Sequence, residues 1–160
     1  MKNEYAQWRK LDNAALAFPA VTGKNDTRVF RFYCELKEEI KEENLQEALE
    51  RTLEKYPLFR AVLRKGLFWF YLERRDIPAV AKKEAGAPCS GLYIPDKKTL
   101  LFRVSYYKNR INFEVFHALT DGTGAMHFLM ELVKNYLYLA HQKEGLEPVS
   151  MLPEDMTVQD

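Results

Sequence analysis

A histidine and an aspartate stand four residues apart in the stretch FEVFHALTDGTGAMHF, which spans residues 113–128. The stretch begins with strand-forming residues and ends with helical apolar spacing, so His117 falls where a predicted strand ends. A neutral imidazole can take a proton from a hydroxyl, a thiol or an amine near neutral pH. Gly122 and Gly124 would let a substrate approach the backbone closely. The pattern is typical of a general base held by a rigid strand.

A purely structural interpretation explains the same residues. A turn that leads into a helix favours Asp or Thr at the N-cap, and Asp121 or Thr123 can fill that position without any chemistry. A single histidine at a strand end is more often structural than catalytic, and glycines also suit a tight turn. The glycines form neither GxGxxG nor a P-loop, so they do not indicate a phosphate site. Residue types alone leave both interpretations open.

The composition is that of an ordinary globular domain. The chain has 160 residues, of which 47% are apolar and 29% charged, and its net charge is +1. This balance gives no electrostatic reason to expect nucleic acid or an anionic membrane as a partner. The polar start predicts no signal peptide, and no apolar run is long enough for a membrane helix. We therefore expect a cytoplasmic protein.

Cysteines and histidines give no metal pattern. Cys34 and Cys89 are far apart and lack CxxC spacing, which predicts neither a disulfide framework nor a zinc site and fits a reducing compartment. His127 and His141 join His117 as the other histidines, without converging Cys or acidic partners in the sequence. We predict no metal site.

Periodicity predicts the elements that position His117. Residues 27–36 form a strand, and residues 58–75 and 100–121 form hairpins that turn at Lys65-Gly66 and Lys108-Asn109. Residues 44–57 and 122–144 carry helical apolar stripes, with Asn44 as N-cap of the first and Pro57 and Gly145 as stops. Residues 1–26 are irregular, and residues 76–98 are loop with a short strand at 91–94. The order predicts an α+β fold, a mainly antiparallel sheet with helices packed on one face.

Three stretches carry a resemblance to a known family. The residues from His117 to Gly122 match HxxxDG, and the sequence resembles the chloramphenicol-acetyltransferase-like (CAT-like) superfamily, which includes peptide-synthetase condensation domains and alcohol acetyltransferases. Upstream, LQEALERTLEKYPLFRAVL resembles the early helix of the family and the strand start after it, and LDNAALAFPA looks like the opening segment of the alcohol-acetyltransferase branch. Phe116 stands where condensation domains usually carry a second histidine, which favours the acetyltransferase-like branches.

The resemblance implies a reaction. His117 would be the general base that deprotonates a small alcohol or amine acceptor, or a thiol, which then attacks an acyl thioester. The donor would be acyl-CoA or the acyl-phosphopantetheine of a carrier protein, and no cofactor would be bound permanently. Gly122 would leave room for the pantetheine arm.

The resemblance also implies a structural group at the site. Asp121 would shape the loop and pair with an arginine rather than touch substrate. Arg60 matches the position of that arginine in condensation domains, and Arg28 and Arg31 are the rival partners.

Only the first half of a two-halved fold is matched, from Leu11 to about residue 141. We interpret residues 1–145 as the N-terminal half of a CAT-like acyltransferase and residues 146–160 as a loose tail or linker to a missing second half. That half or a second subunit would complete the channel, so we expect the 160-residue chain alone to be inactive and to self-associate through uncovered apolar surface. The alternative is a binding or assembly module that keeps the half-fold without turnover.

Overall fold

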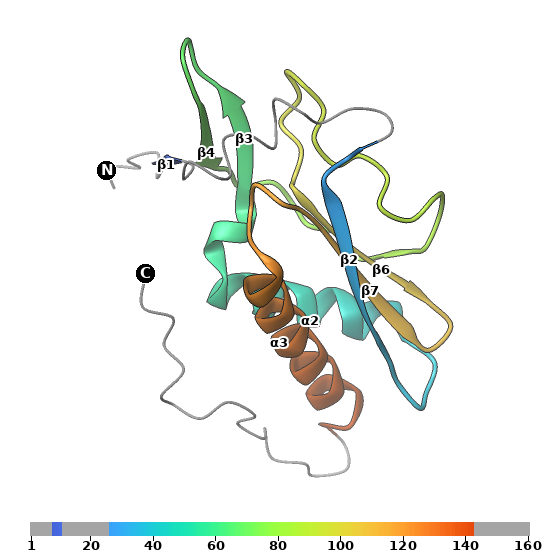
Figure 1. Cartoon of the computed structure of the whole chain (residues 1–160). Coiled ribbons are helices and arrows are strands. Elements are labelled where there is room, and N and C mark those ends of the chain that lie inside the picture. The colour runs from blue at the N-terminus through green and yellow to red at the C-terminus, as the bar shows by residue number, and fades with distance from the viewer. Residues whose placement is uncertain (1–7, 11–25, 143–160) are drawn as a thin grey trace, which may run out of the picture.

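The computed structural model describes residues 8–10 and 26–142, and Figure 1 shows how the elements are arranged. The described strands are β1 (Trp8–Lys10), β2 (Val29–Glu35), β3 (Ala61–Lys65), β4 (Phe70–Arg74), β5 (Lys82–Lys83), β6 (Phe102–Tyr107) and β7 (Arg110–Phe116). The described helices are α2 (Glu42–Lys55), the short 3-10 helix η1 (Pro57–Arg60) and α3 (Gly122–Ala140).

The strands form two sheets. A four-stranded sheet has the order β2-β7-β6-β5, with β7 antiparallel to β2 and β6 and with β5 parallel to β6. A smaller antiparallel sheet has the order β1-β4-β3. Helices α2 and α3 pack against each other and cover one face of the four-stranded sheet (Figure 1). The α+β prediction is confirmed, whereas the division into two sheets was not predicted.

Every second side chain of β7 belongs to the core between the helices and the sheet. Ile111, Phe113 and Val115 are fully buried on the helix face. The ring of Phe113 stacks on Phe128 of α3 with centroids 4.7 Å apart, and Phe59 of η1 lies 4.3 Å from the same Phe128 ring. Aromatic packing of this kind resists deformation, so the junction between β7 and α3 sits on a rigid base.

The start of α2 differs from the prediction. Lys41 is the N-cap in an extended conformation, so Asn44 lies inside the helix and its prediction as a cap was wrong. The Lys41 N–H donates to the Tyr136 hydroxyl of α3 over 3.0 Å. Glu42 and Glu43 in the first turn interact favourably with the helix dipole. A tertiary contact thus sets the start of the helix. Its end was predicted correctly, because Pro57 opens the next element, η1.

Two other expectations need correction. Residues 91–94 form no strand, and the additional strand is β5, whose pairing with β6 a two-residue lysine segment does not reveal. Trp8–Lys10 pairs with β4 instead of being irregular. Both predicted hairpins are present, and Lys108 has the positive φ of 52° that its tight turn requires. The turn of the first hairpin is not at Lys65-Gly66 as predicted, because Lys65 still pairs with Phe70 and the chain reverses over residues 66–69. The LDNAALAFPA segment, Gly145 and residues 146–160 lie outside the described residues.

Candidate functional site

His117 directly follows β7, where the prediction placed it. Its backbone N–H donates to the Arg28 carbonyl over 2.9 Å, which continues the pairing of β7 with β2 by one residue. The half-buried imidazole lies against the Phe30 ring, with centroids 4.4 Å apart. The end of the sheet therefore fixes both the backbone and one face of the ring.

An open cavity of about 720 Å³ lies beside this histidine. One wall is the start of β2 and the residues before it, 26–30, and the other is the loop formed by residues 87–91, which we call the wall loop. His117 lines the cavity with both walls. Volumes of this size are typical of small-molecule sites. The arrangement offers one imidazole to a ligand that enters from solvent.

Both walls contain a non-glycine residue in the left-handed region of φ. Arg28 has a φ of 53° and Cys89 a φ of 54°. Such residues cost about 1–3 kcal/mol each and persist where the surrounding structure over-determines them. Burial raises the pKa of the Cys89 thiol, and the charge of Glu114 adds to that effect. The backbone around the cavity is therefore held in a specific shape, and the thiol in it is protonated near neutral pH.

Asp121 caps α3. Its Oδ1 accepts a hydrogen bond from the Gly124 N–H over 2.8 Å, and its own backbone is extended. A Cβ at Gly124 would overlap the Thr120 Oγ1, so any other residue there would require the Thr120 side chain to move. At Gly122 a Cβ would meet only the Phe32 ring at 3.9 Å, so the packing leaves room beside this residue. The motif therefore sets the sharp turn from β7 into α3.

The ion pair expected between Arg60 and Asp121 is not formed. Arg60 Nη1 lies 3.6 Å from Asp76 Oδ1. The Asp121 carboxylate instead faces the first turn of its own helix, where backbone N–H groups compete for it. The two rival candidates also bind elsewhere, Arg28 to Asp26 and Arg31 to Glu84 and Glu114.

The other histidines lie apart from the cavity lining. His127 is on α3, and His141 Nε2 is 3.9 Å from Glu38 Oε2. Within residues 8–10 and 26–142, no three residues of the types that bind metals come together. No helix in the described part of the chain is long and apolar enough to cross a membrane. Cys34 and Cys89 are free thiols.

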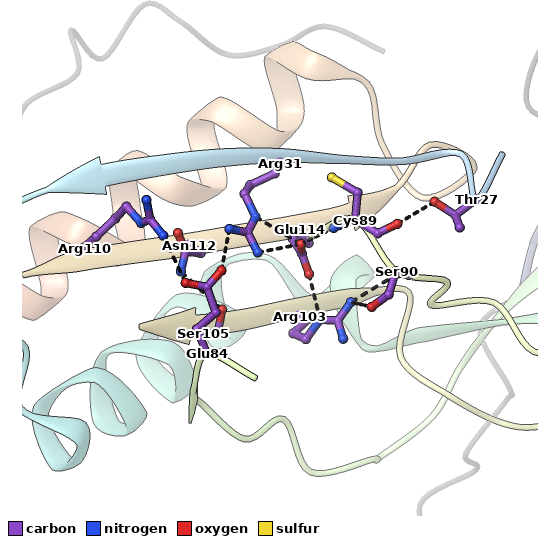
Figure 2. Close-up of polar contacts among 10 residues, drawn as sticks. All are labelled: Thr27, Arg31, Glu84, Cys89, Ser90, Arg103, Ser105, Arg110, Asn112 and Glu114. Carbon is purple, nitrogen blue, oxygen red and sulfur yellow. Dashed lines mark hydrogen bonds and ion pairs between the residues drawn. The ribbon is translucent and has the colours of Figure 1, made fainter. Parts of the chain in front are cut away.

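Sequence reasoning missed a set of charged side chains on the sheet face away from the helices. We call this set, shown in Figure 2, the Glu114 cluster; its members are Arg31, Glu84, Arg103, Arg110 and Glu114. Only 2% of the Glu114 side chain is exposed. The signal was present in the strand NFEVF, where an acidic residue stands between apolar ones at a position that should be buried.

Comparisons with known proteins identify the fold. No family model and no curated protein matches the sequence. Among solved structures, a variant of the starter condensation domain of the rhizomide synthetase RzmA matches with a TM-score of 0.69 at 11% identity, covering 91% of this chain and 40% of that chain. Polyketide synthase associated protein 5 from Mycobacterium tuberculosis matches with a TM-score of 0.64 at 17% identity, covering 91% and 36%.

A third similar structure contains ligands. It is TRI101 of F. sporotrichioides, complexed with coenzyme A and T-2, with a TM-score of 0.52, 12% identity and coverage of 82% and 41%. The chain therefore has the CAT-like fold of condensation domains. It spans about 40% of the length of the structures it matches, so its fold is that of a half-domain.

Proposed function

We propose that this chain is the N-terminal half of an acyltransferase that moves an acyl group from a thioester to an alcohol or amine. The observation that carries the proposal is the position of His117, at the end of β7 on an open cavity of about 720 Å³. The fold shared with condensation domains supports acyl transfer as the class of reaction. The complex of a similar structure with coenzyme A supports a thioester of coenzyme A as donor, and an acyl-phosphopantetheine is the alternative donor.

The chemistry assigned to the imidazole is proton transfer. His117 takes the proton of the acceptor hydroxyl or amine while the acceptor attacks the thioester carbonyl. The tetrahedral intermediate then expels the thiolate, and the imidazolium returns the proton to that sulfur. Phe30 keeps the ring oriented, and the Asp121 cap fixes the turn that follows. The space beside Gly122 is where the pantetheine arm would pass.

Substitution of the base tests this proposal in the native polypeptide that contains this chain. Mass spectrometry of that polypeptide, captured from its source cells, first establishes whether it is longer than this chain. Release of free coenzyme A from acetyl-CoA, with a panel of alcohols and amines, then measures transfer. We expect His117→Ala to lower the rate at least about a hundredfold. His127→Ala is the matched control and should keep the rate, because His127 does not line the cavity. Undiminished transfer by the His117 variant would refute the assignment.

The second candidate function is a binding or assembly module without turnover. The coverage of the similar structures is the observation behind it: the chain matches about 40% of their length, so the residues described here form at most one side of a channel between two halves. A second half or another subunit would then be the partner that completes the site. Binding of acetyl-CoA without release of coenzyme A, under every acceptor tested, would support this module over the enzyme.

A further inference from the structure

The wall loop has no regular secondary structure and is held by side chains behind it. The Cys89 N–H donates to Glu114 Oε1 over 2.6 Å, and Arg103 Nη2 donates to Ser90 Oγ over 2.9 Å. The Thr27 hydroxyl donates to the Cys89 carbonyl over 2.6 Å, which ties the loop to the opposite wall of the cavity. Figure 2 shows these contacts converging on the loop from the sheet. A short irregular segment with this many anchors is a fixed surface.

Glu114 is the centre of these attachments. Its Oε1 accepts from Arg31 Nη2 over 2.8 Å, and its Oε2 accepts from Arg103 Nε over 2.7 Å. A carboxylate this deeply buried needs such partners, because an unpaired one would lose its hydration without compensation. Each of these two arginines also donates a second hydrogen bond, Arg31 to Glu84 Oε1 over 2.6 Å and Arg103 to Ser90 Oγ. One carboxylate thus organises both ends of residues 84–90.

The strand that carries Glu114 also carries the candidate base. Glu114 stands three residues before His117, opposite Arg31 in the pairing of β7 with β2. The wall loop is hydrogen-bonded to Glu114, and only two residues separate Glu114 from His117. The distance from the imidazole to the wall loop therefore depends on β7 and on the hydrogen bonds of Glu114. We propose that Glu114 is a positioning residue that holds the wall loop at a fixed distance from His117 and so sets the width of the cavity for an acyl thioester or its acceptor. The identity of that ligand rests on the proposed function.

Cys89 provides a direct readout of the wall loop. We would alkylate the folded 160-residue chain with iodoacetamide and follow both cysteines by peptide mass spectrometry, with Cys34 as the internal reference. Opening of the loop should expose Cys89 more often, so Glu114→Gln should raise its rate relative to Cys34 by about tenfold or more. Cys34 lies on β2 outside the cavity lining and should keep its rate.

A second variant separates the effect of loop opening on the alkylation of Cys89 from the effect of the lost charge on the pKa of its thiol. Loss of the Glu114 charge would by itself lower the pKa of the Cys89 thiol and speed alkylation, whereas loss of the Arg103 charge would raise that pKa and slow it. Arg103→Gln nevertheless cuts the contacts to Glu114 and Ser90, so a positioning role predicts faster alkylation in this variant too. Because the Arg103 side chain is 35% exposed, we expect this variant to fold. It therefore tests the positioning role even if Glu114→Gln does not fold.

Glu131→Gln is the matched control. Glu131 is also a buried carboxylate with two cationic partners, Lys55 and Lys134, but it lies between α2 and α3 away from the cavity lining. Its variant should lose stability and leave the Cys89 rate within about twofold of the wild type. Alkylation of Cys89 that stays slow in Arg103→Gln, or that rises equally in Glu131→Gln, would overturn the positioning role.

The same readout tests the ligand independently. Saturating acetyl-CoA should slow alkylation of Cys89 in the native polypeptide that contains this chain, without changing the alkylation rate of Cys34. Absence of this protection would count against the donor assigned under the proposed function. It would not alter the comparison of the three variants, so failure of the function and failure of the positioning role are distinguishable.

Discussion

The two faces of β7 are built in opposite ways. Phe113 points to the helices and stacks on Phe128, whereas its neighbour Glu114 points to the other face and binds arginines of β2 and β6. Burial of apolar surface is the dominant favourable contribution to folding, and charge-assisted hydrogen bonds impose strict distances and angles on the few atoms that they join. The helix face therefore contributes most of the stability, and the Glu114 cluster sets the geometry beside the cavity.

Removal of a ring from the helix face should have the largest effect on stability. Phe113→Ala leaves a cavity among Phe59, Phe102 and Phe128 and should lower the free energy of unfolding by about 3–5 kcal/mol. Urea denaturation followed by circular dichroism measures it. Tyr33→Ala is the control on the other face, where the ring is 59% exposed and should contribute less than about 1 kcal/mol. Equal losses in the two variants would contradict the division between the faces.

Glu84 tests the charged face and its dependence on pH. The hydrogen bond from Arg31 holds the pKa of Glu84 below its ordinary value of 4.5, against the opposing effect of burial. Because the folded pKa is lowered, the stabilisation is complete above the unfolded pKa and is lost as the pH falls through the folded pKa. Glu84→Gln should cost about 1–2 kcal/mol at neutral pH.

The same urea titration, repeated from neutral pH down to pH about 3, tests whether the stabilisation by Glu84 is lost as the pH falls. The difference between wild type and Glu84→Gln should shrink as the pH falls below the ordinary pKa of the carboxyl. A difference that stays constant over this range would mean that the charge of Glu84 contributes nothing.

The smallest effect is expected at the junction between the two faces. Asp121→Ala removes the cap of α3 and should cost about 1 kcal/mol, whereas Asp121→Asn keeps an acceptor for the Gly124 N–H and should cost less. Thermal unfolding of both variants measures the difference. A cost several times larger in both variants would contradict a role for Asp121 that is limited to the cap.

Local pattern determined most of the elements and the position of His117. Apolar spacing predicted α2 and α3, alternation predicted β2 and both hairpins, and the strand-to-helix transition placed His117 at the end of β7. These features depend on neighbours within a few residues, which a sequence displays directly. The Asp121 cap was one of two structural options at the motif, and the structure selects it over Thr123.

Only the tertiary structure decided which residues meet across the chain. The start of α2 depends on the Tyr136 hydroxyl, β5 depends on the edge of β6, and Arg60 binds Asp76 instead of Asp121. The Glu114 cluster joins residues from three strands and a loop, with Arg31 and Glu114 separated by 83 positions. Hydrogen bonds of this kind depend on distances within a few tenths of an ångström, and periodicity carries no information about them. The sequence thus determined the elements and the candidate base, and the fold decided the partners that hold the cavity around it.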